Sequence, residues 1–236
     1  GVNAGNSIES GGNYNVVVGD EAGTAITTGD NNVAVGYSAL TANTTGAANV
    51  AMGQGAMLTS TTGSSNTALG QNALYKNTTA DSNTAVGKDT LYENTTGATN
   101  TAVGRIALGA NTTGSSNVAV GYAALDANTT ASNNTAVGYS ALTANTTGSN
   151  NTSIGRESLR VTTTGSNNVG VGSYAMEDNT TGGSNVAIGN SSLSNNTTAS
   201  NNTAVGKNAL LANTTGDNNG AFGYAALDAN TTGYAN

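Results

Sequence analysis

The side chains that could carry acid–base chemistry in this chain are carboxylates, because the sequence contains neither histidine nor cysteine. Without these two residue types there is no Cys/His zinc site, no Cys or Ser–His nucleophile pair, and no His or Cys ligand for haem. The adjacent acidic pairs Asp20–Glu21 and Glu177–Asp178 would point to opposite faces of a strand. We therefore expect no catalytic, cofactor-binding or metal-binding residues, and no enzymatic activity.

Charge and hydropathy exclude two further kinds of partner. Only six Lys and Arg residues are spread along 236 positions, so the chain offers no basic patch for nucleic acid. No apolar run approaches the roughly 20 residues that cross a bilayer, so we expect no membrane insertion. The chain begins with Gly1 and shows no signal peptide, which indicates a processed product or a segment of a longer protein.

Most of the chain consists of a 17-residue repeat, and this repeat must position any side chain that has a chemical or binding role. From Asn15 onward, 13 copies of one motif follow one another without insertion or deletion. The motif is Asn-(Thr/Val)-Ala-Val-Gly-x-x-Ala-Leu-x-x-Asn-Thr-Thr-Gly-x-x. Repeat positions are numbered from this first Asn, so Asn15 is position 1. We expect residues 1–14 to form a degenerate first coil or an N-terminal cap, and residues 15–236 to form one continuous array.

The constant positions of the repeat predict a short strand and a corner. Position 4 is apolar and position 5 is Gly in all 13 copies, whereas position 9 is Leu or Met in 12. Positions 2 to 4 alternate as a strand does, with positions 2 and 4 on one face. The following Gly allows a corner with positive φ or a close backbone approach. The Asn-Thr-Thr-Gly segment at positions 12 to 15 predicts a second short strand or corner.

Stacking of the copies is the only way in which so short a repeat becomes stable. Seventeen residues are too few for a helix pair, and one copy buries too little apolar surface to offset the backbone entropy of ordering it. We therefore predict an all-β fold, a parallel β-solenoid (β-roll or β-helix) with one repeat per coil and 13 full coils.

The same argument predicts which residues build the solenoid. We expect the apolar side chains of positions 4 and 9 to form the core ladder, including Val35, Leu69, Val86, Val103, Val120, Val137, Leu40, Leu74, Leu91, Leu108, Leu125 and Leu142. The corners are expected at the position 5 glycines, including Gly36, Gly70, Gly87, Gly104, Gly121 and Gly138.

The asparagines have two alternative interpretations. Stacked Asn side chains can form ladders of amide hydrogen bonds, and the sequence leaves open which Asn position points inward. Asn-Thr-Thr is also an acceptor pattern for N-glycosylation. Candidate sites are Asn43, Asn77, Asn94, Asn111, Asn128 and Asn145. If these side chains line the interior of the coils, none of them is modified.

Two further residue types suggest surface contacts. The paired Thr residues of positions 13 and 14, such as Thr44 and Thr45, suggest an ice-binding array, but neighbours on a strand point to opposite faces. Position 6 varies freely and holds Tyr37, Tyr122 and Tyr139, so we expect it to face outward. Exposed tyrosines suit contact with a partner chain or a glycan.

The run Asn-Thr-Ala-Val-Gly-Tyr-Ser-Ala-Leu at residues 134–142, with related runs at 32–40 and 117–125, resembles two groups of repeats. It is similar to the β-roll head repeats of trimeric autotransporter adhesins. It is more similar to the Asn-Thr-Thr-Gly/Asn-Thr-Ala-Val-Gly repeats of phage tail fibres and bacterial surface proteins, and this likeness covers residues 15–236. The resemblance implies a left-handed, homotrimeric, extracellular fibre that attaches to a surface. The period of 17 departs from the shorter period of many adhesin heads.

Taken together, these patterns lead us to expect a non-enzymatic structural element of an extracellular fibre. Its leading form is a homotrimeric β-solenoid shaft or head of a surface adhesin or phage tail fibre, on a cell or virion surface. The chain ends in register for another copy, so the alternative is a subunit that polymerises end to end into a filament. An ice-binding solenoid is the third hypothesis. The expected partners are other copies of the chain and a cell-surface or glycan receptor.

Overall fold

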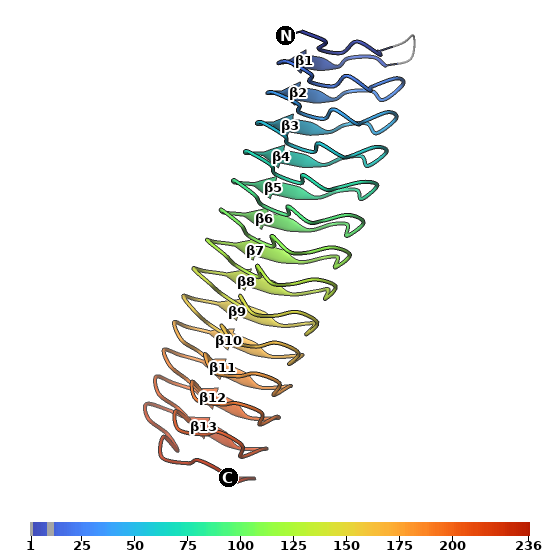
Figure 1. The fold of residues 1–236 in the computed structure, drawn as a ribbon. Helices are drawn as coiled ribbons and strands as arrows, with labels where there is room; N and C mark the ends of the chain where they lie inside the picture. The colour runs from blue at the N-terminus through green and yellow to red at the C-terminus, as the bar shows by residue number, and fades with distance from the viewer. Residues whose placement is uncertain (1, 9–11) are drawn as a thin grey trace. The chain divides into compact units, whose positions relative to one another are not determined.

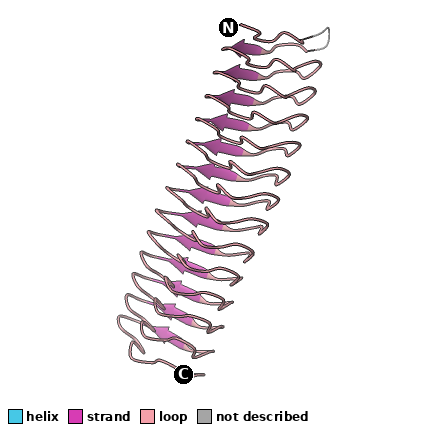
Figure 2. Cartoon of the chain, viewed as in Figure 1, coloured by secondary structure: helices cyan, strands magenta, loops and turns pink. Residues whose placement is uncertain are grey.

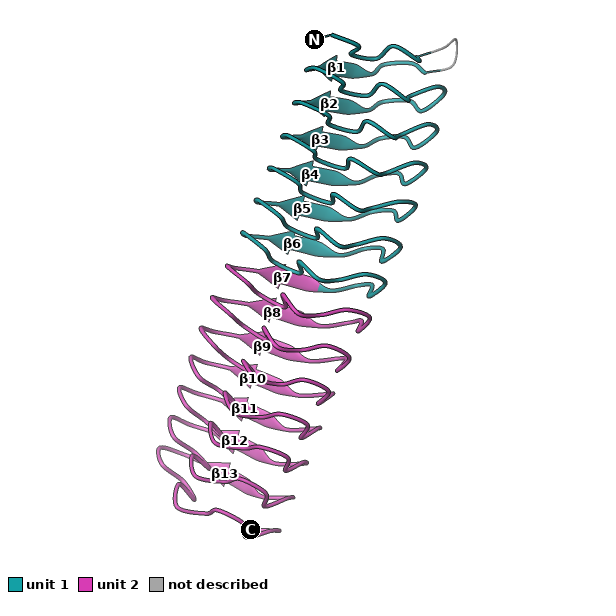
Figure 3. Ribbon diagram, viewed as in Figure 1, with its two compact units in different colours: residues 1–117 teal, residues 118–236 magenta. Residues whose placement is uncertain are grey.

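The computed structural model describes residues 2–8 and 12–236, and that part of the chain contains strands and turns but no helix (Figure 2). The chain divides into two compact units, Gly1–Asn117 and Val118–Asn236, which are coloured separately in Figure 3. In each unit, successive coils stack on one another, and every coil contributes one strand (Figure 1).

Each strand is three residues long and occupies repeat positions 2 to 4. The first unit contains β1 (Val16–Val18), β2 (Val33–Val35), β3 (Val50–Met52), β4 (Thr67–Leu69), β5 (Thr84–Val86) and β6 (Thr101–Val103). The second unit contains β7 (Val118–Val120), β8 (Thr135–Val137), β9 (Thr152–Ile154), β10 (Val169–Val171), β11 (Val186–Ile188), β12 (Thr203–Val205) and β13 (Gly220–Phe222).

Within each unit, neighbouring strands are parallel and pair residues that are 17 positions apart. Val33 of β2 lies beside Val50 of β3, for example. The amide of Val33 donates to the Asn49 carbonyl, and the amide of Gly53 donates to the Val35 carbonyl, both at 2.8 Å. The predicted all-β fold, a parallel β-solenoid with a 17-residue coil, is therefore confirmed.

The opposite side of the coil carries a second ladder of hydrogen bonds between coils. The Leu40 amide donates to the Ala56 carbonyl at 3.0 Å, and the Thr44 amide donates to the Thr61 carbonyl at 2.8 Å. The Thr44 hydroxyl donates to that same carbonyl at 3.2 Å. Positions 12 to 15 therefore form a bend rather than the second strand that was one of the two predictions.

The core consists of one large and two small side chains per coil. The leucines predicted at position 9 are fully buried, namely Leu40, Leu74, Leu91, Leu108, Leu125 and Leu142. They pack between the alanines of position 3 and position 8, such as Ala34 and Ala39, which are also fully buried. The position 9 half of the predicted core ladder is therefore confirmed.

The position 4 half of the predicted core ladder is wrong. Its members lie on the outer side of the strands and are half-exposed, namely Val35, Leu69, Val86, Val103, Val120 and Val137. Positions 2 and 4 do share a face, as the alternation predicts, but position 3 is the one that points inward. The physical reason is space, because even a Cβ added to Gly170 at position 3 would lie 2.6 Å from Ser158 Oγ and 3.3 Å from Leu159 Cδ1. In the 12 coils with Leu or Met at position 9, position 3 is Ala, Ser or Gly, and valine occurs there only as Val17, in the coil where Gly23 stands at position 9.

The position 5 glycines form the corners, as predicted. Gly36, Gly70, Gly87, Gly104, Gly121 and Gly138 all have φ between 130° and 141°. The coils also approach each other closely here, since a Cβ on Gly36 would lie 2.7 Å from the Gly53 carbonyl oxygen. Both reasons given for glycine therefore apply at the same residue.

Three further positions of the coil place residues other than glycine in the left-handed region. Position 9 does so with Leu40 (φ 53°), position 7 with Ile106 (φ 53°) and position 17 with Asn31 (φ 58°). This conformation costs L-residues about 1–2 kcal/mol, and Asn tolerates it better than most. Burial offsets the cost for the leucines of position 9, whereas the half-exposed Ile106 has little compensation.

Residues 2–8 of the predicted first coil form a turn that is hydrogen-bonded to the first full repeat, and the amide of Asn13, also within that predicted coil, donates to Asp30 Oδ1 at 2.7 Å. The Gly5 amide donates to the Ala22 carbonyl at 3.0 Å, and the Glu21 amide donates to the Val2 carbonyl at 3.1 Å. Residues 1 and 9–11 of the predicted first coil or cap lie outside the described residues.

The core can be tested within a single coil. We expect Leu91→Ala to lower the free energy of unfolding by about 2–5 kcal/mol, because Leu91 is fully buried and its truncation leaves a cavity. Lys88→Ala, an exposed change three residues away, should alter it by less than about 0.5 kcal/mol. Urea unfolding of both variants provides the measurement, and equal losses would contradict this assignment of the core.

The left-handed residues of position 7 allow a reciprocal test. Ile106→Asn should raise the free energy of unfolding by about 1 kcal/mol, because Asn tolerates positive φ better than a β-branched residue. Asn208→Ile, at the same position with φ 60°, should lower it by a similar amount. Thermal unfolding followed by circular dichroism would show the two shifts, and shifts of the same sign would rule out backbone conformation as the cause.

Candidate interaction surfaces

The outer side of the strands in each unit is an uncharged, largely apolar surface. We call the side chains of repeat positions 2 and 4 the strand face. Position 2 is Val in six coils, Thr in six and Gly in one, while position 4 is Val, Ile, Leu, Met or Phe. Met52, Ile154 and Ile188 are 43%, 41% and 41% exposed. No position of the strand face carries a charge.

Parallel sheets are normally covered on both faces. Here one face of the sheet covers the core, whereas the strand face is open in the single chain. The constant register stacks like positions about 4.8 Å apart, so the exposed side chains form two parallel rows along each unit. Contiguous apolar surfaces of this kind are typical of interaction sites.

Both asparagine positions point inward, which settles the question that the sequence leaves open. At position 1, Asn100 Nδ2 donates to the Gly114 carbonyl at 2.9 Å, and its Oδ1 accepts from the Asn117 amide at 2.9 Å. At position 12, Asn111 Nδ2 donates to Asn94 Oδ1 at 2.8 Å and to the Gly114 carbonyl at 2.9 Å. Each Asn thereby links its own coil to a neighbouring coil.

This burial contradicts glycosylation of the folded chain at the candidate sites. Asn43, Asn77, Asn94, Asn111, Asn128 and Asn145 all have zero exposure. A glycan on any of these nitrogens would remove donors to the buried carbonyls and could not be accommodated between coils. These six residues are therefore structural.

The position 12 ladder is interrupted where the repeat departs from Asn. Ser60 and Thr162 occupy position 12 in two coils. In the coils before them, the buried oxygens Asn43 Oδ1 and Asn145 Oδ1 have no hydrogen-bond partner. Elsewhere the next Asn donates to this oxygen, as Asn145 Nδ2 does to Asn128 Oδ1 at 3.0 Å. The side chains of Ser60 and Thr162 are too short to continue the ladder.

The paired threonines divide their roles. Position 13 hydroxyls donate to the carbonyl of the next coil, as Thr95 does to Thr112 at 3.0 Å. Position 14 threonines such as Thr45 and Thr96 are exposed. The Thr side chains of position 14 therefore form the exposed row, whereas those of position 13 are half-buried.

Aromatic and charged side chains gather on the turns that follow the strands. Position 6 faces outward as predicted, with Tyr37 and Tyr139 51% and 53% exposed. Tyrosine rings at the same repeat position of neighbouring coils stack on each other. Their centroids are 4.9 Å apart for Tyr75 and Tyr92 and 5.4 Å apart for Tyr122 and Tyr139.

The ion pairs on these turns also join neighbouring coils. Lys76 Nζ lies 2.7 Å from Glu93 Oε2, and Arg160 Nη2 lies 2.9 Å from Glu177 Oε1. The hydrogen bond to Glu93 raises the pKa of Lys76, and the hydrogen bond to Glu157 raises the pKa of Arg156. Because the Lys76 and Arg156 side chains are 45% and 60% exposed, these pairs contribute little to stability.

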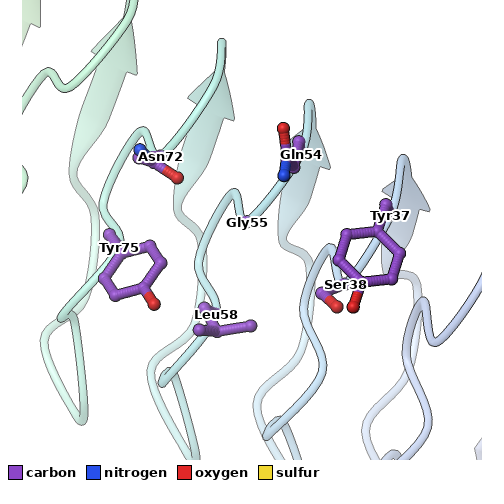
Figure 4. A pocket seen from close by; sticks show the side chains of 7 residues that line it. All are labelled: Tyr37, Ser38, Gln54, Gly55, Leu58, Asn72 and Tyr75. Carbon is purple, nitrogen blue, oxygen red and sulfur yellow. The ribbon is translucent and has the colours of Figure 1, made fainter.

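Hollows open on these turns in both units. A hollow of about 410 Å³ in the second unit is lined by Tyr139, Arg156 and Glu157. A hollow of about 270 Å³ in the first unit is lined by Tyr37, Ser38, Gln54, Gly55, Leu58, Asn72 and Tyr75 (Figure 4). Neither hollow was predicted from the sequence. The sequence does contain a signal for the hollow in the first unit, because Gly55 is the only glycine at position 7 in the 13 copies.

No group of three or more acidic side chains suited to a metal ion occurs in the described residues. Those residues also contain no helix long and apolar enough to span a bilayer.

Comparison of the chain with protein-family models, with curated proteins and with solved structures gave no match. The site is therefore interpreted from its own geometry.

The interrupted ladder can be repaired by mutation. We expect Ser60→Asn to raise the free energy of unfolding by about 1 kcal/mol, because the new amide would supply the missing donor to Asn43 Oδ1. Thr162→Asn should act in the same way on Asn145 Oδ1. Ser60→Ala serves as the matched control and should not stabilise. Urea unfolding gives the comparison, and an unstable Ser60→Asn variant would count against an amide ladder at position 12.

Proposed function

We propose that this chain is a non-enzymatic structural element of an extracellular fibre and that it associates with copies of itself through the strand face. The observation that carries this proposal is the uncharged apolar surface of positions 2 and 4, which is open in the single chain. At about 25 cal/mol per Å² of apolar surface removed from water, covering such a face favours association.

The chemistry of the strand face favours a second copy of the chain as its partner. The strand face contains no charged side chain, so it has no group that would bind a charged partner selectively. Its rows of side chains also repeat at the same spacing as the rows of a second, identical chain. Two copies aligned along their strands would therefore meet Val against Val and Thr against Thr over many coils. Self-complementary surfaces of this kind are the usual basis of symmetric oligomers.

The narrowness of the strand face favours a trimer. Positions 2 and 4 are about 7 Å apart along a strand, so each chain offers a strip only two side chains wide. Three such strips can close around a common axis and cover each other completely. This arrangement agrees with the resemblance to homotrimeric adhesin and tail-fibre repeats, from which we also infer a cell-surface or virion-surface location.

Ice binding is less well supported than self-association. A lattice-matching surface needs uniform rows, whereas position 2 mixes Thr with Val and position 4 ranges from Val103 to Phe222. The exposed Thr of position 14 forms a single row. The filament alternative differs from the trimer in its mass, so the same experiment separates them.

Light scattering on the purified chain tests the proposal. We expect one species of three times 22.9 kDa. The double variant Val86→Lys/Val103→Lys places charges on the strand face of β5 and β6 and should shift the mass toward that of a single chain. Thr96→Lys/Thr113→Lys adds the same charges at exposed position 14 residues and should leave the trimer intact.

Each other outcome would redirect the assignment. Particles of indefinite length that persist in the strand-face variant would favour the filament subunit. A monomeric wild-type chain would refute self-association, and thermal hysteresis of that monomer would then support ice binding.

A further inference from the structure

We infer that the hollow between Tyr37 and Tyr75 is a binding site for a neutral sugar ring. The inference goes beyond the proposed function by assigning a ligand class to one location. It does not depend on the strand face, since the lining residues occupy positions 6, 7 and 10 of three successive coils.

The position of the hollow in the repeat is the first argument. The solenoid dictates the residues at its core, corner and ladder positions, whereas positions 6, 7 and 10 vary between copies. A site for a ligand can be built only where the repeat leaves the residue type free. In the first unit these free positions bring together two tyrosines, a leucine, a serine and two amide side chains (Figure 4).

The missing side chain of Gly55 creates the space. Gly55 is buried at the floor of the hollow with φ 66°. A Cβ at this residue would lie 2.9 Å from Asn72 Oδ1 and 3.3 Å from Tyr75 Cε2. Any longer side chain would therefore enter the volume between Asn72 and the Tyr75 ring. Gly55 is the only one of the 13 position 7 residues without a side chain, so this coil differs from the others at the floor of the hollow.

The hollow has two aromatic walls, and one of them is held in place. Tyr75 stacks on Tyr92 with its ring plane inclined by 9°, which fixes its orientation. Tyr37 is 51% exposed on the opposite side of the hollow (Figure 4). Aromatic side chains offer a flat apolar surface together with a polar hydroxyl. A pyranose ring, with an apolar face of C–H groups and a rim of hydroxyls, matches both features.

The polar groups of the hollow remain available for such a rim. Asn72 Nδ2 donates to Asp89 Oδ1 at 2.9 Å, and Gln54 Oε1 accepts from Gln71 Nε2 at 3.4 Å. Within the described residues, Asn72 Oδ1 and Gln54 Nε2 have no partner of their own. One acceptor and one donor can therefore address sugar hydroxyls.

Charge and size narrow the ligand class. No residue that lines the hollow is charged, and the chain as a whole has a net charge of −7, so an acidic sugar is disfavoured. The volume of about 270 Å³ lies just under the range of about 300–1,000 Å³ typical of sites for larger ligands. The site therefore fits one ring of an oligosaccharide.

A titration with defined sugars tests the inference. Two neutral probes, maltotriose and tri-N-acetylchitotriose, and one acidic probe, N-acetylneuraminic acid, are added to the full chain and followed by saturation-transfer NMR. We expect saturable binding of at least one neutral probe with a dissociation constant in the millimolar range, and weaker binding of the acidic probe.

Gly55→Asn should weaken that binding at least tenfold by filling the hollow. The backbone tolerates this change, because Asn72 and Asn208 occupy position 7 in other coils with φ 55° and 60°. Ser191→Asn makes the same kind of change at position 7 of the second unit and is the matched control. Tyr37→Ala, which removes an exposed wall, should also weaken binding and provides a second variant should Gly55→Asn misfold.

Failure of this inference is distinguishable from failure of the proposed function. Absence of saturable binding by both neutral probes, equal binding by Gly55→Asn and the wild type, or tighter binding of the acidic probe would each overturn the sugar site. None of these results bears on the mass measured by light scattering. Conversely, the strand-face variant Val86→Lys/Val103→Lys should still bind the sugar even when it no longer forms a trimer.

Discussion

Every coil of this protein depends on its neighbours for its hydrogen bonds, and the rest of the structure follows from that constraint. A coil of 17 residues has no helix and only three residues of strand, so most of its main-chain donors find acceptors in the coil before or after it. The buried asparagines extend the same rule to side chains, since Asn100 bonds both within its own coil and to Asn117 of the next. A register that never slips is the condition for all these bonds.

Close approach of the coils explains the small residues as well as the polar ones. Corner glycines such as Gly36 lie where the backbone of the next coil leaves no room for a Cβ. Position 3 is restricted to Ala, Ser or Gly wherever a buried Leu or Met of position 9 fills the interior. Valine is thereby displaced to the outside, and the strand face is the consequence. The apolar surface on which the proposed self-association rests therefore originates in the narrowness of the coil.

The regular stacking of the coils fixes the residue type at some positions of the repeat and leaves it variable at others. The core, corner and Asn positions repeat because each coil must stack, and Ser60 and Thr162 show that a departure leaves a buried oxygen without a partner. Positions 6, 7 and 10 carry no such requirement. They differ between copies, and only there do features such as the stacked rings of Tyr75 and Tyr92 or the hollow above Gly55 arise. Individual sites on a repetitive scaffold are therefore found where the repeat is least regular.

The 17-residue coil, the parallel stacking, the corner glycines and the buried leucines of position 9 could all be predicted from the amino-acid sequence. These features follow from the 17-residue period and from the backbone conformation that each residue type favours. The regular spacing of Gly36, Leu40 and their equivalents indicates both. The face of the strand that lies inside could not be predicted in this way, because alternation shows that Val33 and Val35 share a face but not whether that face is covered. That choice depends on the width of the coil, to which residues of the opposite side such as Leu40 contribute. The inward direction of the asparagines and the hollow between Tyr37 and Tyr75 were likewise decided by contacts between coils, which no single repeat contains.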